Sequence, residues 1–398
     1  MNIFKRIFTK TKAELIEEVK LTGDVEYYIV DYNDYIDLVH DACSICYNRG
    51  VENRTFEDKV QYIHRRGLTG HESIYEHSNF IIQYTCDERL LNEVMDILDI
   101  NKYLNSKIKI IEDKIFLLLG GSIRGYKHIV RNIEDPNNKV YKAILESMYE
   151  MNKCFFGDFI EDNIMQEHKF KLSDIDTQPH YKRIELEKST IRHMYNLDAI
   201  IHKLIEIGSP FNYEDLLSMC TITIHFKDVS RSISQQLVRH RGTGITQASQ
   251  RYINATNAPF LSPANFKPEK YDKNEKYEIN FGNKKHHFTL QELGDEIIKL
   301  YPQLVKHGLL KEDARSFLPM NVKTNLYMTF TFLGFIKFLE LREEKHAQAE
   351  IQLISKELGT EFRKHLNLGE DIFKYLEPKY KRIESQLEDS YGDIDEII

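Results

Sequence analysis

The feature that most constrains this chain is the segment of residues 239–252, which reads RHRGTGITQASQRY and is called the basic segment below. It opens with three cationic or titratable side chains, Arg239, His240 and Arg241, and two glycines follow them. Glycine lets a backbone approach a ligand closely, and arginine offers a planar fork of donors that matches phosphate or the carbonyls of a pyrimidine. A surface that needs only solubility has little use for arginine on both sides of such a loop, so the segment indicates an anion site. The residues alone are equally consistent with a solvated helix face.

The bulk composition is that of an ordinary globular chain. Its 398 residues, 41% hydrophobic and 29% charged, allow one large or two ordinary domains. The net charge of −8 argues against a protein that coats nucleic acid through its overall charge, so anion binding requires a local basic patch. No apolar run approaches the roughly 18 residues of a membrane span, and the first residues lack the features of a signal peptide. Five scattered cysteines predict reduced thiols and a cytoplasmic location.

Apolar spacing predicts an α/β (α+β) chain. Strands are expected at 26–32, around 80–84 and at 220–226, and helices at 34–49, 56–67, 90–104, 138–156, 197–208 and 288–307. Residues 253–285, rich in Asn, Pro and Lys, predict a long surface loop. No Gly-x-Gly-x-x-Gly follows a strand, so a Rossmann cofactor fold is not supported.

A second informative stretch is residues 70–84, GHESIYEHSNFIIQY. Its members His71, Glu76 and His77 could suggest a metal site, but their spacing is not that of H-E-x-x-H and no third ligand is evident, so no metal is predicted. Cys43 and Cys46 form a C-x-x-C without a second pair nearby, which favours structural burial.

Several of these motifs resemble those of one family. Arg-His-Arg, seven residues, Ser249 and a closing Arg-Tyr are similar to the signature of the flavin-dependent thymidylate synthases, the ThyX family. The approach SRSISQQLVRHR (230–241) and the 70–84 stretch resemble the same family, as do Arg315 before Leu-Pro and the run LREEKHAQAEI (341–351). The resemblance implies a ThyX-type fold, with a central mixed sheet flanked by helices, and a homotetramer with shared active sites.

The resemblance also implies a division of the chain. In the family the strand after the 70–84 stretch leads almost at once to the Arg-His-Arg motif, whereas here residues 86–219 intervene. We therefore expect an N-terminal ThyX-like part at 1–85, a mostly helical insertion at 86–219, a C-terminal part at 220–365 and a charged tail at 366–398.

The chemistry implied by the resemblance is reductive methylation of dUMP to dTMP. Adding a methyl group at C5 of uracil needs a one-carbon donor and a hydride, and no side chain supplies hydride, so a cofactor must. The family implies FAD as hydride carrier, NADPH as its reductant and methylenetetrahydrofolate as donor.

Site residues carry over by position. The dUMP set is Gln236, Arg239, Gln247, Ser249, Arg251, Arg315 and Arg342. The FAD set is His71, Ser73, Glu76, Arg239, His240, Arg241, Thr246, His346, Arg124 and His128. Arg342 and Ser249 form the catalytic set: Arg342 would donate to a uracil carbonyl, whereas Ser249 lacks a base at triad-like spacing and takes a binding role.

The chain departs from the family pattern at several flavin positions. Gly244 and Thr246 stand where serine and asparagine are usual, and Thr331, Leu333 and Lys337 replace polar residues of a C-terminal helix. Residues 120–130, GGSIRGYKHIV, resemble that helix, so Arg124 and His128 are expected to supply the missing contacts. The alternative is that these two residues form a solvated helix face.

The spacing of Arg342, His346 and Glu350 predicts that they drift slowly around one helical face, a pattern that also fits a salt-bridged surface.

Two other functions stay open. One is a flavin enzyme of the same fold that modifies C5 of another pyrimidine nucleotide. The other is a non-catalytic nucleotide- or RNA-binding paralogue, although the basic pieces between the motifs are sparse, and neither nucleic acid nor membrane is expected as a partner.

Overall fold

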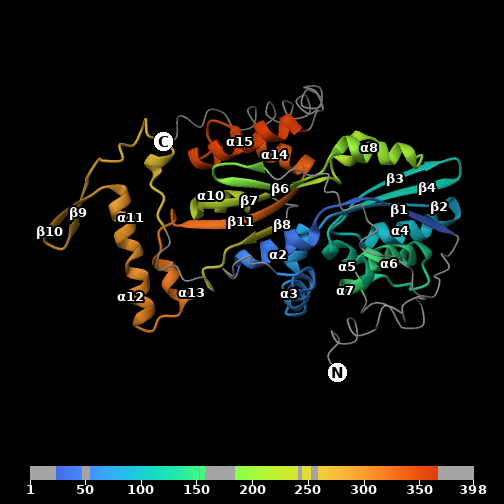
Figure 1. Cartoon of the computed structure of the whole chain (residues 1–398), viewed down its shortest axis with the longest axis horizontal. Coiled ribbons are helices and arrows are strands. Elements are labelled where there is room, and N and C mark those ends of the chain that lie inside the picture. The colour runs from blue at the N-terminus through green and yellow to red at the C-terminus, as the bar shows by residue number, and fades with distance from the viewer. Residues whose placement is uncertain are drawn as a thin grey trace.

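The structure, a computed structural model, describes residues 24–46, 54–151, 153–156, 184–240, 244–251 and 259–365. Two antiparallel sheets lie beside each other and form the body of the protein (Figure 1). The first sheet has the order β1-β2-β4-β3, and the second has the order β5-β6-β7-β11-β8.

The first sheet contains β1 (Val25–Tyr32), β2 (Phe80–Asp87), β3 (Asn105–Ile111) and β4 (Lys114–Gly121). The second contains β5 (Ile184–Glu185), β6 (Ser189–Met194), β7 (Thr221–Ser230), β8 (Gly244–Gln247) and β11 (Lys323–Thr331). A separate two-stranded ribbon is formed by β9 (Tyr277–Phe281) and β10 (Lys284–Phe288). The central strands are rich in Ile, Phe, Leu and Thr, residue types that fit a pleated, buried surface.

Helices cover both sheets. Those before the basic segment are α2 (Tyr35–Cys46), α3 (Phe56–Leu68), α4 (Leu91–Ile100), α5 (Ile123–Asn132), α6 (Lys139–Met151), α7 (Lys153–Phe156), α8 (Leu197–Glu206), α9 (Tyr213–Leu216) and α10 (Arg231–Leu237). Those after it are α11 (Leu290–Ile298), α12 (Leu300–Lys306), α13 (Lys311–Ala314), α14 (Phe332–Glu343) and α15 (Ala349–His365). Short 3₁₀ turns are η1 (Glu72–His77), η2 (Glu88–Leu90), η4 (Pro263–Asn265) and η5 (Arg315–Phe317).

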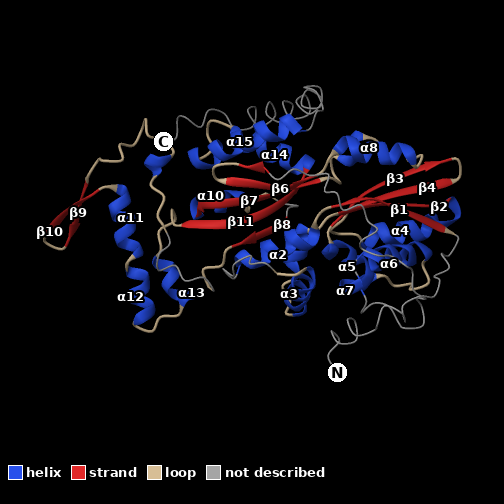
Figure 2. Ribbon diagram, in the orientation of Figure 1, coloured by secondary structure: helices blue, strands red, loops and turns tan. Residues whose placement is uncertain are grey.

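The helices form layers on the two sheets. Helices α14 and α15 lie on one side of the second sheet and α2 on the other, while α4 to α7 lie below the first sheet (Figure 2). Phe330, Phe335 and Phe338 are fully buried between the second sheet and α14, and burial of each contributes about 1.5–3 kcal/mol. Helices α11 to α13 and the β9–β10 ribbon extend to one side (Figure 1).

The α/β class is confirmed, but the expected single mixed sheet is not what forms. Every strand pairing described is antiparallel, and the strands divide into two main sheets. Residues 86–219 do not make a separate helical body either, because β3 and β4 complete the first sheet while β5 and β6 belong to the second. The hairpin of β9 and β10 likewise begins inside the expected 253–285 loop.

The predicted helical face of Arg342, His346 and Glu350 is also wrong. Helix α14 ends at Glu343 and α15 begins at Ala349, so the intervening turn changes the chain direction. His346 lies exposed in that turn, while Glu350 is buried at 1% exposure. Cys43 is buried and Cys46 half-buried, as the sequence predicted for that pair.

Candidate functional site

Helix α10 leads directly into the basic segment and is fixed at its start by two contacts. The Ser230 hydroxyl accepts from the Ile233 N–H at 3.2 Å and caps the helix. The Ser230 N–H donates to Oε1 of Glu350 at 2.9 Å. Burial raises the pKa of Glu350 above its usual value, even though its hydrogen bonds to Ser230 oppose this. Glu350 therefore links α15 to the strand–helix turn that carries the basic segment.

At the far end of α10, three predicted site residues meet. Arg342 donates through Nε to Nε2 of His240 at 3.1 Å, and through Nη1 and Nη2 to the side-chain and backbone oxygens of Gln236 at 3.3 and 3.2 Å. Gln236 in turn donates to Gln348 at 2.9 Å. Burial and the charge of Arg342 lower the pKa of His240 to about 4. His240 is therefore neutral near pH 7, with Nε2 as the acceptor and the proton on Nδ1.

The start of α10 lies near a second group of arginines. Arg251 donates to the Glu312 carboxylate at 3.1 Å, and Arg315 donates to the Glu312 backbone oxygen at 3.1 Å. Burial and the nearby charge of Arg315 lower the pKa of Arg231, the first residue of α10. Both predicted phosphate-binding arginines thus contact Glu312, Arg251 at the carboxylate and Arg315 at the backbone oxygen, and Arg231 lies close to Arg315.

Helix α10 sets the spacing between these two groups. Its seven residues span about 10 Å at 1.5 Å per residue. A mononucleotide, with a phosphate at one end and a ring with carbonyls at the other, has dimensions on this scale. The arrangement offers cationic donors for the phosphate by Arg315 and a fixed guanidinium for the ring at Arg342.

The two sheets meet where η1 contacts β8. A Cβ on Gly244, the first residue of β8, would lie 2.6 Å from the backbone oxygen of Glu76, so only glycine fits there. The departure at this position from the usual serine therefore follows from the close approach of η1. The Glu76 carboxylate forms an ion pair with Arg124 of α5. Burial raises the pKa of Glu76, and the charge of Arg124 offsets part of that rise.

Threonines hold a buried histidine at the same junction. His77 Nδ1 lies 3.0 Å from the Thr329 hydroxyl, and Nε2 lies 2.9 Å from the Thr246 hydroxyl. Thr329 continues to Thr223 at 2.8 Å. Complete burial lowers the pKa of His77 to about 3. The hydroxyl of Thr246, a residue predicted to contact the flavin, makes this contact between the sheets.

Helix α5 places Arg124 and His128 against one aromatic ring. The Arg124 guanidinium carbon lies 5.4 Å from the centre of the Tyr103 ring, and His128 meets the same ring edge-on at 4.9 Å. A second ion pair, between Arg131 and Glu72 at 2.6 Å, also joins α5 to η1. Arg124 therefore belongs to the η1–β8 junction and not to an isolated solvated face.

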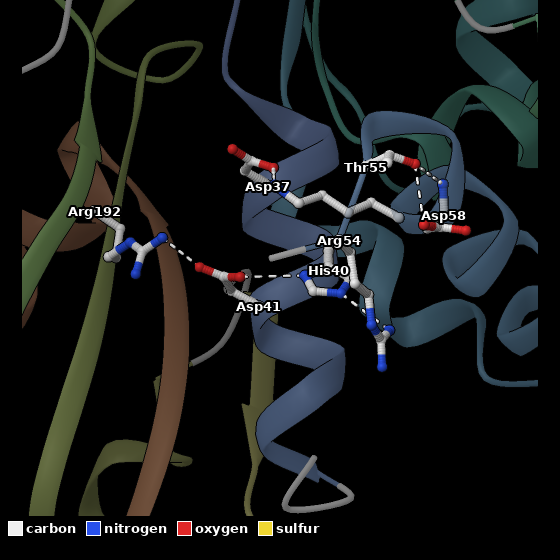
Figure 3. Close-up of polar contacts among 8 residues, drawn as sticks. Asp37, His40, Asp41, Arg54, Thr55, Asp58 and Arg192 are labelled. Atoms are coloured by element: carbon white, nitrogen blue, oxygen red, sulfur yellow. Dashed lines mark hydrogen bonds and ion pairs between the residues drawn. The ribbon is translucent and has the colours of Figure 1, made fainter. Parts of the chain in front are cut away.

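A polar chain ties α2 to β6 beside this junction (Figure 3). Arg54 contacts His40 Nε2 at 3.2 Å, His40 Nδ1 lies 3.3 Å from Asp41, and Asp41 pairs with Arg192 of β6. Burial opposes ionisation of Asp41, but the His40 hydrogen bond and the Arg192 charge outweigh it and lower its pKa. The two carboxylate oxygens of Asp41 therefore contact residues on different elements, His40 on α2 and Arg192 on β6.

The remaining predicted residues are more dispersed. Gln247 donates to Thr324 at 3.3 Å, and the Ser249 hydroxyl accepts from the Arg251 N–H at 3.3 Å. The predicted flavin residues with exposed side chains are His71, Ser73, Arg239 and His346. Arg241 and Tyr252 lie outside the described residues.

Sequence reasoning missed four residues of this site. Arg231 lay within the motif approach, but no pattern showed that it would lie near the charge of Arg315. Glu312 and Thr329 carry no local signal, because their partners are distant in sequence. His77 was weighed only as a metal ligand, whereas the structure gives it two threonine partners. Across the described ranges there is no cluster of His, Cys, Asp and Glu that could hold a metal ion, and no helix there is long and apolar enough to cross a membrane.

Comparison with known proteins identifies relatives. The family model described as "Thymidylate synthase complementing protein" matches residues 165–366, about half of the chain. A flavin-dependent thymidylate synthase of Thermococcus onnurineus is 32% identical over 190 residues, which cover 46% of this chain and 70% of that protein. The enzyme of the same name from Pyrococcus abyssi is 32% identical over 162 residues, covering 40% of this chain and 61% of that protein. The 70–84 stretch lies outside the matched family range.

A solved structure is also similar to part of this chain. The crystal structure of ThyX from Helicobacter pylori with FAD and dUMP is 19% identical and covers 46% of this chain and 97% of that chain, at a TM-score of 0.33.

Proposed function

This chain belongs to the thymidylate synthase complementing protein family, and from that premise we propose that it is a flavin-dependent thymidylate synthase that converts dUMP to dTMP. The chain spans less than two thirds of some of its relatives, so the complete reaction is a proposal for this protein. The observation that carries it is α10, which joins the Arg342 group to the arginines around Glu312.

The dUMP site follows from that geometry. Arg251 binds the phosphate in place of the Glu312 carboxylate, and Arg315 binds it from the same side, because both arginines carry donors in fork geometry. Arg342, held by His240 and Gln236, donates to a pyrimidine carbonyl. Gln247 and Ser249 line the nucleotide from β8 and the loop after it, with Ser249 in a binding role.

The donor set at the η1–β8 junction fits FAD. Arg124, Arg239 and His71 supply cationic or polar groups for its phosphates and ring, and Gly244 brings the backbone of β8 close to η1. When bound, the flavin supplies the hydride, with NADPH as its reductant and methylenetetrahydrofolate as the carbon donor. His240 is neutral at this site, so the positive charge near the ring comes from arginine.

Arg342 carries the electrostatic part of the reaction in this proposal. A guanidinium already fixed by two partners needs little reorganisation when negative charge develops on the pyrimidine carbonyl. Removal of one such donor typically costs about 2.7–4 kcal/mol of transition-state stabilisation. A homotetramer with shared active sites is part of the same proposal.

The test begins with the absorption spectrum of the purified protein. We expect flavin bands that bleach on NADPH addition under argon, faster with dUMP than without, and dTMP formation only when methylenetetrahydrofolate is present. Arg342→Ala should lower dTMP formation about 100-fold or more. Arg363→Ala, whose side chain pairs with Glu343 at 3.0 Å on the exposed surface, is the matched control and should retain activity.

The outcomes separate the alternatives. A coloured protein that modifies a different pyrimidine nucleotide, or gives a product of another mass, would favour the sister flavin enzyme. A protein that stays colourless after incubation with FAD would refute the synthase and favour a non-catalytic nucleotide-binding paralogue.

A further inference from the structure

The two sheets repeat one topology. In the first, four strands taken in chain order are arranged first, second, fourth, third, as β1-β2-β4-β3. Without the two-residue β5, the second reads β6-β7-β11-β8, which is the same order with the same antiparallel pairing. We call β1 to β4 with their helices the first unit, and β6 to β8 and β11 with theirs the second unit.

The elements between the strands also correspond. A helix follows the first strand in each unit (α2, α8), a short helical turn precedes the second strand (η1, α9), a helix follows that strand (α4, α10), and two helices follow the last strand (α5 and α6, α14 and α15). Helices α3 and α7 belong only to the first unit, and β9, β10 and α11 to α13 only to the second.

Local irregularities coincide as well. The β1–β2 register shifts between Ile29 and Asp31, and the β6–β7 register shifts between Ile191 and His193. Each shift thus surrounds one residue, Val30 or Arg192, two places before the last residue of a strand that a helix follows. A shared fold class does not require a bulge at the same place.

The last strand ends in the same cap in both units. Ser122 follows β4 and accepts from the Gly125 N–H, and Thr331 ends β11 and accepts from the Gly334 N–H. Because cap and glycine have the same spacing, Arg124 corresponds to Leu333 and His128 to Lys337. This equivalence explains why the polar positions missing from α14 are found on α5.

The units contact each other reciprocally. Asp41, the seventh residue of α2, pairs with Arg192 in the β6 bulge. Lys203, the seventh residue of α8, donates at 3.1 Å to the backbone oxygen of Val30 in the β1 bulge. Each first helix therefore reaches the first strand of the other unit, and α8 lies over the first sheet while α2 lies by β8 (Figure 1).

The two junctions between units are equivalent by position. His77 lies two residues before Asn79, whose carbonyl accepts a hydrogen bond from the N–H of the residue after β1. In the same way, Met219 lies two residues before Thr221, whose carbonyl accepts from the N–H of the residue after β6. His77 contacts Thr329, which lies two residues before Thr331, the cap of α14. Met219 packs on Gly120, two residues before Ser122, where a Cβ would be 2.5 Å from the Met219 sulfur.

The charged residues of the two junctions have diverged. At the η1–β8 junction, Glu76 and Arg124 from the first unit meet the strand that follows Arg239 and His240 of the second. At the equivalent α9–β3 junction, Ser218 and Leu333 take the places of Glu76 and Arg124. Strand β3 begins at residue 105 as β8 begins at residue 244, so the three residues equivalent to Arg-His-Arg are 100–102, which read Ile-Asn-Lys.

The α9–β3 junction is closed by contacts within the protein. Lys109 of β3 donates to Asp215 at 2.7 Å and to the Pro210 backbone oxygen at 2.8 Å, and its ammonium lies 5.2 Å from the centre of the Phe211 ring. Because the Lys109 ammonium already has these partners, it is not available to bind a phosphate.

We propose that the chain is an internal pair of one repeated unit, in which the η1–β8 junction keeps the flavin–nucleotide site and the α9–β3 junction has become a structural contact. Each unit supplies one half of the retained site, so one chain binds one flavin and one dUMP. The identity of the ligands rests on the proposed function. The expected insertion at 86–219 is, on this proposal, the end of one unit and the beginning of the next.

The test measures how many ligands each full-length chain binds and which of the two junctions binds them. FAD and dUMP are titrated separately by calorimetry or equilibrium dialysis into the wild type, Arg124→Ala at the retained junction and Lys109→Ala at the closed one. We expect one FAD and one dUMP per chain. Loss of one charged hydrogen bond should weaken FAD binding of Arg124→Ala about ten- to a hundredfold, and Lys109→Ala should bind as the wild type does. Urea unfolding of both variants verifies that they are folded.

Each other outcome has a distinct meaning. The inference of one retained and one structural junction would be overturned by two flavins or two nucleotides per chain, or by equal weakening of FAD binding in the two folded variants. The synthase proposal would still stand in these cases. If no FAD binds, the synthase proposal fails and the dUMP titration decides the inference. One dUMP per chain would then support a single retained site, and two or none would overturn it.

Discussion

Replacing His77 with glutamine should make the protein less sensitive to acid. His77 joins η1 to β8 and β11 through hydroxyls of Thr246 and Thr329 at 2.9 and 3.0 Å, and its side chain is fully buried. Glutamine can donate to one threonine and accept from the other, but it does not titrate. The variant thus removes the charge change while it keeps partners for both hydroxyls.

The magnitude follows from the difference between folded and unfolded states. Burial lowers the folded-state pKa of His77 to about 3, against about 6.5 in the unfolded chain. Between these values the unfolded state binds more protons, so the stability that neutral His77 provides is complete above about pH 6.5 and is lost as the pH falls toward 3. At pH 5 the loss is about 2 kcal/mol for this residue.

Urea unfolding at pH 7 and pH 5 measures this contribution. The wild type should lose about 2 kcal/mol more than His77→Gln between the two pH values. Burial also lowers the pKa of His193 to about 3, and that residue contributes equally to both proteins. His202→Gln, at an exposed position of α8, controls for replacing a histidine and should match the wild type. Equal acid sensitivity of His77→Gln and the wild type would refute the reasoning.

Three further substitutions test the site and its supports. Gly244→Ala places a methyl group 2.6 Å from the Glu76 backbone oxygen and should cost about 1–3 kcal/mol in urea unfolding; an unchanged midpoint would show that η1 is not this close to β8. Asp41→Asn removes the carboxylate charge from the partly buried pair with Arg192 and should cost about 1.5–3 kcal/mol, a figure that a loss under about 0.5 kcal/mol would contradict. Arg342→Lys keeps the charge but not the fork that contacts His240 and Gln236, so kcat for dTMP formation should fall at least tenfold, and wild-type kcat would show that charge alone suffices.

The sequence determined the local elements and the chemistry of its motifs. Apolar periodicity predicted α2, α3 and β1 nearly to their observed limits, because amphipathic spacing is a local property. Residue types in the basic segment indicated a possible anion site, whereas the roles of Arg342 and of the other site residues were implied by the family resemblance. The structure places Gln236 and Arg342, predicted for dUMP, in hydrogen-bond contact with each other and Arg342 in contact with His240, predicted for FAD.

Only the tertiary structure decided how these elements pair. Whether β2 is followed by an insertion or completes a sheet with β3 and β4 depends on contacts between strands separated by dozens of residues, which no window of sequence contains. The same holds for Glu312 between Arg251 and Arg315, and for His77 between two threonines of the other sheet. The repeated unit was hidden for a related reason: packing preserves strand order, bulges and caps, whereas side chains such as Arg124 and Leu333 are free to diverge once only one junction needs them.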